Sequence, residues 1–220
     1  MRIRLLAVCA ALLLGVLTAA GCGDSGDDAA AGGATAAATT AEHVEHVGTT
    51  AAFEGGVVEP RRAAPPLRLK DIDGKVVDLA DYKGSPVLVT FVYATCPDVC
   101  PLIMASLRQV HDSSKLGRSV KVIAVSVDPE RDTTPVVRKF LARQRAGGFV
   151  DYLVGTRAEL EPVWADWQVG TQVPKDNPEL VEHSALIYGI TAGGELATAY
   201  PVGFEPAGVT RDLPLLAAKS

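Results

Sequence analysis

The chain has 220 residues, of which 48% are hydrophobic and 21% charged, and a formal net charge of −5. This length suits one domain with an additional segment, and the apolar content excludes a chain that is disordered throughout. The acidic balance argues against a nucleic-acid-binding protein, which needs a basic face.

The first 21 residues have the pattern of an export signal. Two arginines precede the uninterrupted apolar run Leu5–Ala20, and small residues then lead to Cys22. The ending Thr18–Cys22 resembles the bacterial lipoprotein cleavage box, although Ala19 stands where that pattern prefers Leu. The resemblance implies a lipid on Cys22 and a protein held at the extracytoplasmic face of the cell membrane. Ordinary signal cleavage and an uncleaved anchor are the alternatives.

Residues 22–60 are rich in Ala, Gly, Thr and Asp and contain almost no large apolar side chains. Such a segment cannot bury a core, so we predict a disordered tether between the membrane and a domain spanning residues 65–220. His43 and His46 lie in this tether. We interpret them as solvated side chains, with a weak metal-collecting pair as the alternative.

From Pro65 onward, segments of strand and helix character alternate along the chain. The apolar run Pro86–Tyr93 is nearly continuous, as expected of a strand buried on both faces. Thr134-Pro135 and the capping box at Thr156 each mark the start of a helix. In chain order we predict a hairpin of Leu67–Lys70 and Lys75–Leu79, the strand Pro86–Tyr93, a helix over Leu102–Ser114, the strand Val120–Val127, a helix from Thr134, the strand Tyr152–Val154, a helix ending near Trp167, and a hairpin of Ser184–Ile190 and Glu195–Tyr200. This order predicts an α/β fold with one central sheet.

Two cysteines stand where the first central strand meets its helix, in the run FVYATCPDVCP. Cys9 lies in the signal, so Cys96 and Cys100 are the only thiols expected in the folded domain. Pro101 belongs in the first turn of a helix and disfavours helical torsions at Cys100. We therefore expect both thiols on a loop and a first turn, and neither deep on a packed helix face.

The spacing of these two cysteines fits either a disulfide or two sulfurs that converge on one metal ion. The helix start is expected to lower a thiol pKa, and thiolates are soft ligands that select copper(I). Two histidines of the domain are candidates for a third ligand. His111 is expected on the surface, and His183, which precedes the strand Ser184–Ile190, is by pattern alone more typical of a structural histidine.

Three motifs in order resemble the Sco/SenC family: FVYATCPDVCP, then Val125–Thr133 (VSVDPERDT), then Glu182-His183-Ser184. The resemblance covers about Pro65 to Gly203. It implies a thioredoxin-like fold, with a central mixed β-sheet flanked by helices and an N-terminal β-hairpin. It also implies copper binding by Cys96, Cys100 and His183, with Asp128–Asp132 shaping the rim of the site.

Proteins of this family handle copper during assembly of the dinuclear copper site of cytochrome c oxidase. The resemblance therefore implies a metallochaperone, not primarily an enzyme, whose partner is the copper-site subunit of the oxidase. Other copper donors or thiol reductants are further partners. Reduction of the target's cysteines by the pair Cys96 and Cys100 is a second activity that the residues allow.

Three other functions remain open from the residues. The first is a membrane-tethered thiol–disulfide reductase without a metal role, which the three residues between the cysteines disfavour, because thioredoxins usually have two. The second is a peroxidase, which needs a threonine where Tyr93 stands. The third is a binding or scaffold module with a purely structural disulfide.

Overall fold

The computed structural model describes residues 52–177 and 180–218. The expected export signal, Cys22, and the tether as far as residue 51, with its two histidines, lie outside the described residues. Among the helices of the described part, none is both long and apolar enough to cross a membrane.

The domain is built on an eight-stranded mixed sheet in the order β1-β10-β9-β4-β5-β6-β2-β3. The central strands β4, β5 and β6 are parallel, and the strands on either side pair antiparallel. The strands are β1 (Gly56–Ala63), β2 (Arg68–Asp71), β3 (Val76–Asp78), β4 (Val87–Val92), β5 (Lys121–Ser126), β6 (Val150–Val154), β9 (Leu186–Ile190) and β10 (Glu195–Pro201). The predicted α/β fold with one mixed sheet, including the hairpin β2–β3, is confirmed.

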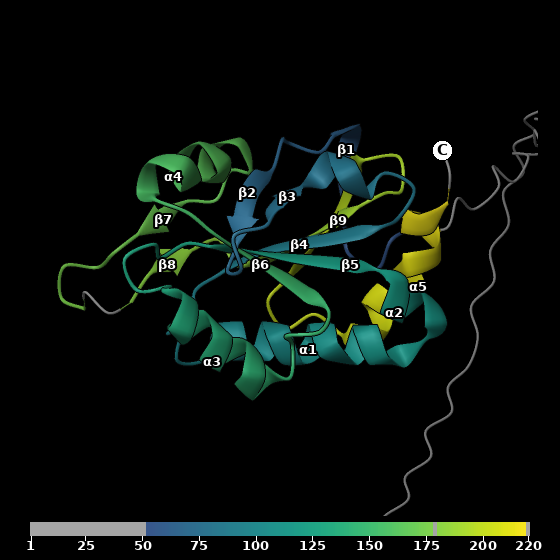
Figure 1. Cartoon of the computed structure of the whole chain (residues 1–220). Helices are drawn as coiled ribbons and strands as arrows, with labels where there is room; N and C mark the ends of the chain where they lie inside the picture. Colours follow the sequence, from purple (N-terminus) through teal and green to yellow (C-terminus); the bar gives the residue numbers. More distant parts are fainter. Residues whose placement is uncertain (1–51, 178–179, 219–220) are drawn as a thin grey trace, which may run out of the picture. The chain divides into compact units, whose positions relative to one another are not determined.

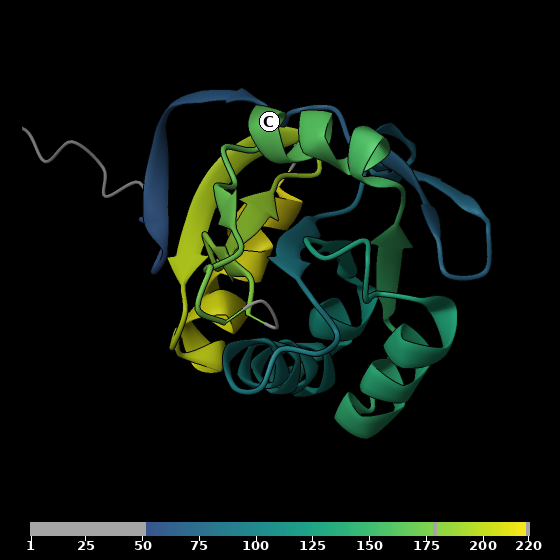
Figure 2. The ribbon, with the colours of Figure 1, turned by 90° about the vertical axis from the view of Figure 1, so that its left-hand side faces the viewer.

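Helices cover both faces of this sheet. The parallel connections through α1 and α3 have the same right-handed sense, so these two helices share one face, whereas α4 lies on the other (Figures 1 and 2). Helix α5 packs beside α1 and α2. The helices are α1 (Val99–Ser113), α2 (Lys115–Ser119), α3 (Thr134–Gln144), α4 (Arg157–Asp166), α5 (Pro206–Ala217) and the 3-10 turn η1 (Leu79–Tyr82).

The sequence signals act locally as predicted. All six residues of β4 are buried, because helices cover both faces of the sheet at this strand. Thr156 and Glu159 form the predicted capping box at the start of α4. An aromatic cluster holds the end of α4 on the sheet. It consists of Trp167, Phe91 and Tyr188, whose ring centroids are 5.3–6.1 Å apart.

The folded domain begins earlier than the predicted boundary near Pro65. Strand β1 pairs antiparallel with β10 at the edge of the sheet, so residues 56–60, assigned to the tether from the sequence, belong to the domain. Seven of its eight residues are exposed, and an edge strand held mainly by backbone hydrogen bonds has no apolar pattern to detect.

The sequence also gave no indication of α5. Pro206 and Pro214 lie within it, which obscured its apolar face. The helix is held in part by the buried Asp212, whose carboxylate accepts hydrogen bonds from the Tyr200 hydroxyl at 2.8 Å and from the Glu54 backbone N–H at 2.9 Å.

Candidate metal centre

The site is built at one edge of the sheet, where neighbouring parallel strands end. Strand β4 leads into the cysteine loop and α1, and β5 leads into the loop Asp128–Asp132. Because β4 and β5 are parallel, both loops leave the sheet at the same edge, which is where open α/β sheets form their sites.

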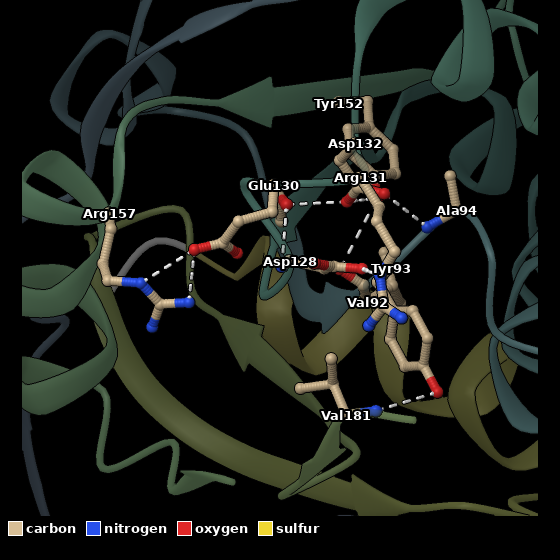
Figure 3. Close-up of polar contacts among 11 residues, drawn as sticks. Val92, Tyr93, Ala94, Asp128, Glu130, Arg131, Asp132, Tyr152, Arg157 and Val181 are labelled. Carbon is tan, nitrogen blue, oxygen red and sulfur yellow. Dashed lines mark hydrogen bonds and ion pairs between the residues drawn. The ribbon is translucent and has the colours of Figure 1, made fainter. Parts of the chain in front are cut away.

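A buried carboxylate joins these two loops. The Asp132 side chain accepts a hydrogen bond from the Ala94 N–H at 2.8 Å, from the Ser126 hydroxyl at 2.6 Å and from the Tyr152 hydroxyl at 2.7 Å. Figure 3 shows Asp132 between Tyr152 and Ala94. Ala94 lies two residues before Cys96 in the sequence. Burial raises the pKa of Asp132 to about 6, against the opposing effect of its three hydrogen bonds. The carboxylate therefore fixes the backbone that presents Cys96.

The rest of this loop forms ion pairs with different degrees of burial. The Arg131 guanidinium donates to the buried Asp128 carboxylate at 2.5 Å, and Arg157 of α4 donates to Glu130 at 2.7 Å (Figure 3). The Glu130–Arg157 pair is about half exposed on both sides, so it contributes little to stability.

The two thiols lie at the start of α1, but their environments differ. Helix α1 begins at Val99, three residues before the predicted start, and Cys100 lies inside its first turn and is 0% exposed. The expectation that neither thiol lies deep was wrong for Cys100. Proline lacks a backbone N–H, but N–H groups in the first turn have no partner within the helix, so Pro101 is tolerated there and the helix can include the residue before it. Cys96 is 9% exposed.

Contact between the two cysteines shifts the pKa values of their thiols in opposite directions. Both are free thiols, and the Cys100 backbone N–H donates to the Cys96 sulfur at 3.4 Å. The hydrogen bond from the Cys100 thiol, helped by backbone N–H groups at the helix start and by the Tyr93 hydroxyl, lowers the pKa of Cys96 to about 6 despite burial. The same hydrogen bond, together with burial, raises the pKa of Cys100 well above its usual range. Cys96 is therefore the thiolate and Cys100 its proton-bearing partner.

His183 lies on β8 (Glu182–His183), which pairs with β7 (Thr171–Gln172) in a separate two-stranded sheet. Strand β9 follows directly and runs antiparallel to β4, which brings His183 to the edge that carries the cysteines. Burial lowers the pKa of His183, so the imidazole is neutral at pH 7. Within residues 52–177 and 180–218, however, no three His, Cys, Asp or Glu side chains lie close enough together to hold a metal ion.

Tyr93 contacts both halves of this divided site. Its ring meets the His183 ring edge-on with centroids 6.0 Å apart, and its hydroxyl accepts from the Val181 N–H at 3.4 Å (Figure 3). The same hydroxyl bonds to Cys96, and burial raises the pKa of Tyr93 to about 12. This role of Tyr93 was not predicted from the sequence. A tyrosine at the end of an apolar strand is a signal for it, because a buried hydroxyl needs a partner.

The remaining histidine of the domain is remote from the cysteines. His111 lies in the last turn of α1, 11 residues beyond Cys100, and stacks on Phe149 with centroids 4.5 Å apart. It is more buried than the predicted surface position, with 22% of its side chain exposed.

The model of the SCO1/SenC family matches residues 57–217. The chain belongs to the SCO1/SenC family. This family member is 33% identical to the human mitochondrial SCO1 homolog over 121 residues, which cover 52% of this chain and 40% of the relative. It is also 33% identical to the SCO1 protein homolog of Bacillus subtilis, over 61% of this chain and 72% of the relative. The chain spans about half the length of the mitochondrial relatives that it matches.

Among solved structures, this family member is similar to the copper-bound ScoI of Bradyrhizobium japonicum. The two are 31% identical with a TM-score of 0.59, over 70% of this chain and 99% of the other. The thioredoxin-like fold that the motifs implied is thereby confirmed.

The polarised thiol pair predicts a specific pH dependence of alkylation in the reduced, metal-free protein. Iodoacetamide should modify Cys96 with a rate midpoint near pH 6 and leave the buried Cys100 unmodified, as measured by mass spectrometry. In Cys100→Ala the midpoint should rise by about 1 pH unit or more toward the ordinary thiol value, because the largest stabilising hydrogen bond is lost. Tyr93→Phe, which removes a weaker contact, should give a smaller rise. An unchanged midpoint in Cys100→Ala would contradict this assignment.

The buried Asp132 predicts a pH dependence of stability. Its folded pKa of about 6 lies above the ordinary value of 3.8, so its contribution is fully present below pH 3.8 and is lost as the pH rises through 6. The difference is worth on the order of 3 kcal/mol. Asp132→Asn removes this titration, so the free energy of unfolding in urea should decline less between pH 4 and 7 in the variant than in the wild type. Parallel profiles for the two proteins would show that Asp132 does not titrate in this range.

Proposed function

We propose that this protein is a copper chaperone that holds copper through Cys96, Cys100 and His183 and delivers it to the dinuclear copper centre of cytochrome c oxidase. The observation that carries the proposal is the contact between two free thiols at the start of α1, one of them a thiolate at neutral pH. Further support comes from the family, because the related ScoI of Bradyrhizobium japonicum has been solved with copper bound. Delivery to the oxidase follows from the family resemblance.

The donor set suits copper as a cargo. Thiolate sulfur is a soft ligand that selects copper(I), and a neutral imidazole completes the environment that suits copper(II). Two thiolates and one imidazole around copper(II) sum to zero charge, whereas two thiolates alone hold copper(I) in an anionic complex. The burial that keeps His183 neutral thus leaves a ring nitrogen free of a proton for the metal.

Binding through all three residues requires a rearrangement of the described structure. His183 Nδ1 lies 3.2 Å from the Ser184 carbonyl oxygen, and the Tyr93 ring packs against the imidazole. Strand β8 pairs over only two residues and stands outside the main sheet. In our proposal, β8 moves toward the cysteine pair when copper binds, while Asp132 and α1 hold the sulfurs in place.

The proposal includes a location. Residues 1–21 act as an export signal, Cys22 carries a lipid, and the segment before β1 tethers the domain at the extracytoplasmic face of the membrane. Thiols in an oxidising compartment become linked unless a metal or a reductant intervenes. Copper loading or a thiol reductant would prevent a disulfide between Cys96 and Cys100 in that compartment.

A purely redox role without metal is not favoured, since the chain belongs to a family with copper-bound members. The unequal thiols do support reduction of target cysteines as a second activity of the same site. Cys96 has the low pKa of an attacking thiolate, and Cys100 lies in position to resolve a mixed disulfide.

Copper titration of the purified domain tests the ligand set. His183→Ala should weaken copper(II) binding by at least about 10–100-fold, the range that loss of even an outer-shell partner reaches, and should abolish the thiolate-to-copper absorption bands. Copper(I) binding by the cysteines should persist. His111→Ala is the matched control, because it removes an imidazole at the far end of α1. An unchanged copper(II) spectrum in His183→Ala would remove His183 from the site.

A cellular test addresses the partner. Deletion of the protein should lower cytochrome c oxidase activity, and added copper should restore it in part. Complementation with His111→Ala should succeed and complementation with His183→Ala should fail. Normal oxidase activity in copper-poor medium after deletion would rule out the chaperone role.

A further inference from the structure

The two thiols differ in their access to solvent. Cys100 has no exposed surface, whereas Cys96 borders a cleft of about 540 Å³ between the cysteine loop and α3. Helix α3 lies beside α1 on the same face of the sheet (Figure 1). A partner group that enters this cleft can therefore approach Cys96, whereas Cys100 is shielded from it.

The α3 wall of the cleft is positively charged, in contrast to the chain as a whole. Helix α3 contains three basic residues and no acidic residue, although the chain carries a net charge of −5. One of the three, Arg138, pairs with Asp73. The other two, Lys139 and Arg143, are exposed and line the cleft four residues apart, on one face of the helix.

Neither Lys139 nor Arg143 makes an ion pair with any residue of the described ranges 52–177 and 180–218. Two like charges at this spacing destabilise a helix. Val136 and Phe140 of α3, and Pro97 and Pro101 of the cysteine segment, also line the cleft and add apolar surface. The cleft thus combines a reactive sulfur, apolar lining and two cations without an ion pair.

We propose that this cleft docks an acidic, cysteine-bearing peptide segment of the protein that receives copper or electrons, with carboxylates of the segment on Lys139 and Arg143 and its cysteine sulfur at Cys96. The proposal rests on the proposed function, which requires a partner thiol at this site. Charge complementarity selects the occupant: the net negative charge of the chain repels an acidic partner elsewhere, so the basic helix orients the encounter toward Cys96.

A thiol-exchange assay tests this surface without copper. The probes are three short peptides in which a single cysteine, flanked by Glu, Gln or Lys, is disulfide-linked to thionitrobenzoate. The Cys96 thiolate attacks the peptide sulfur, which forms the Cys96–peptide disulfide and expels the coloured thionitrobenzoate thiolate with the electron pair of the broken bond. Cys100 then displaces the peptide thiol without further colour, so with protein in excess the absorbance reports the first step alone.

At low salt the Glu peptide should react about tenfold faster than the Lys peptide, and high salt should reduce this preference. The double variant Lys139→Glu with Arg143→Glu should reverse it. The matched control, Lys115→Glu with Lys121→Glu, changes the net charge equally at the opposite edge of the sheet, where β5 begins, and should keep the wild-type preference. Circular dichroism verifies that each variant is folded.

Three outcomes would each overturn the proposal. The wild type could react with the three peptides at equal rates, the α3 variant could keep the preference for the Glu peptide, or the control variant could lose this preference as fully as the α3 variant. Copper(I) titration of the same proteins separates this result from the chaperone function. Equal rates for the three peptides with the wild type, together with normal copper(I) binding, count against the docking surface alone. Absent copper(I) binding by the wild type counts against the chaperone function alone.

Discussion

The buried carboxylate of Asp132 is the interaction on which the geometry of the site depends. It accepts hydrogen bonds from the loop after β4, from the last residue of β5 and from the middle of β6, and so joins all three parallel strands. Each donor is buried and would lose a partner without it, at a cost of roughly 1–3 kcal/mol per group. The same carboxylate has a raised pKa, which shows that burial opposes its charge. The buried charge of Asp132 is therefore electrostatically unfavourable, but its hydrogen bonds make the cysteine loop rigid.

The rigid loop makes two chemically similar thiols unequal. Cys96 gathers hydrogen bonds from the Cys100 thiol, from the start of α1 and from Tyr93, all of which favour its thiolate. Cys100 is enclosed in the first turn of the helix, where burial and the neighbouring sulfur favour its protonated form. In the proposed function, copper binding and thiol exchange use the same atoms, since both begin with a thiolate that an incoming group can reach.

The histidine half of the site is held differently. His183 is brought to the cysteine edge by the antiparallel pairing of β9 with β4, but its own strand pairs over two residues only. The Tyr93 ring packs nearly perpendicular to the imidazole of His183, and its hydroxyl bonds to Cys96, so one side chain contacts both residues. A third element, α3, contributes Lys139 and Arg143 to the wall of the cleft that Cys96 borders.

Local sequence signals determined the central strands, the hairpin β2–β3, the capping box of α4 and the position of the two thiols at the start of a helix. Each of these features depends only on residues that are near one another in the sequence. The edge strand β1 and helix α5 escaped prediction, since the first is held by backbone pairing and the second by distant contacts such as that of Asp212 with Tyr200. Other features of the site join distant residues: Asp132 bonds Ala94 and Tyr152, which are 38 and 20 positions away, and Tyr93 bonds Val181, which is 88 positions away. Only the tertiary structure decides these, because which donor meets which acceptor depends on strand order and not on spacing along the chain.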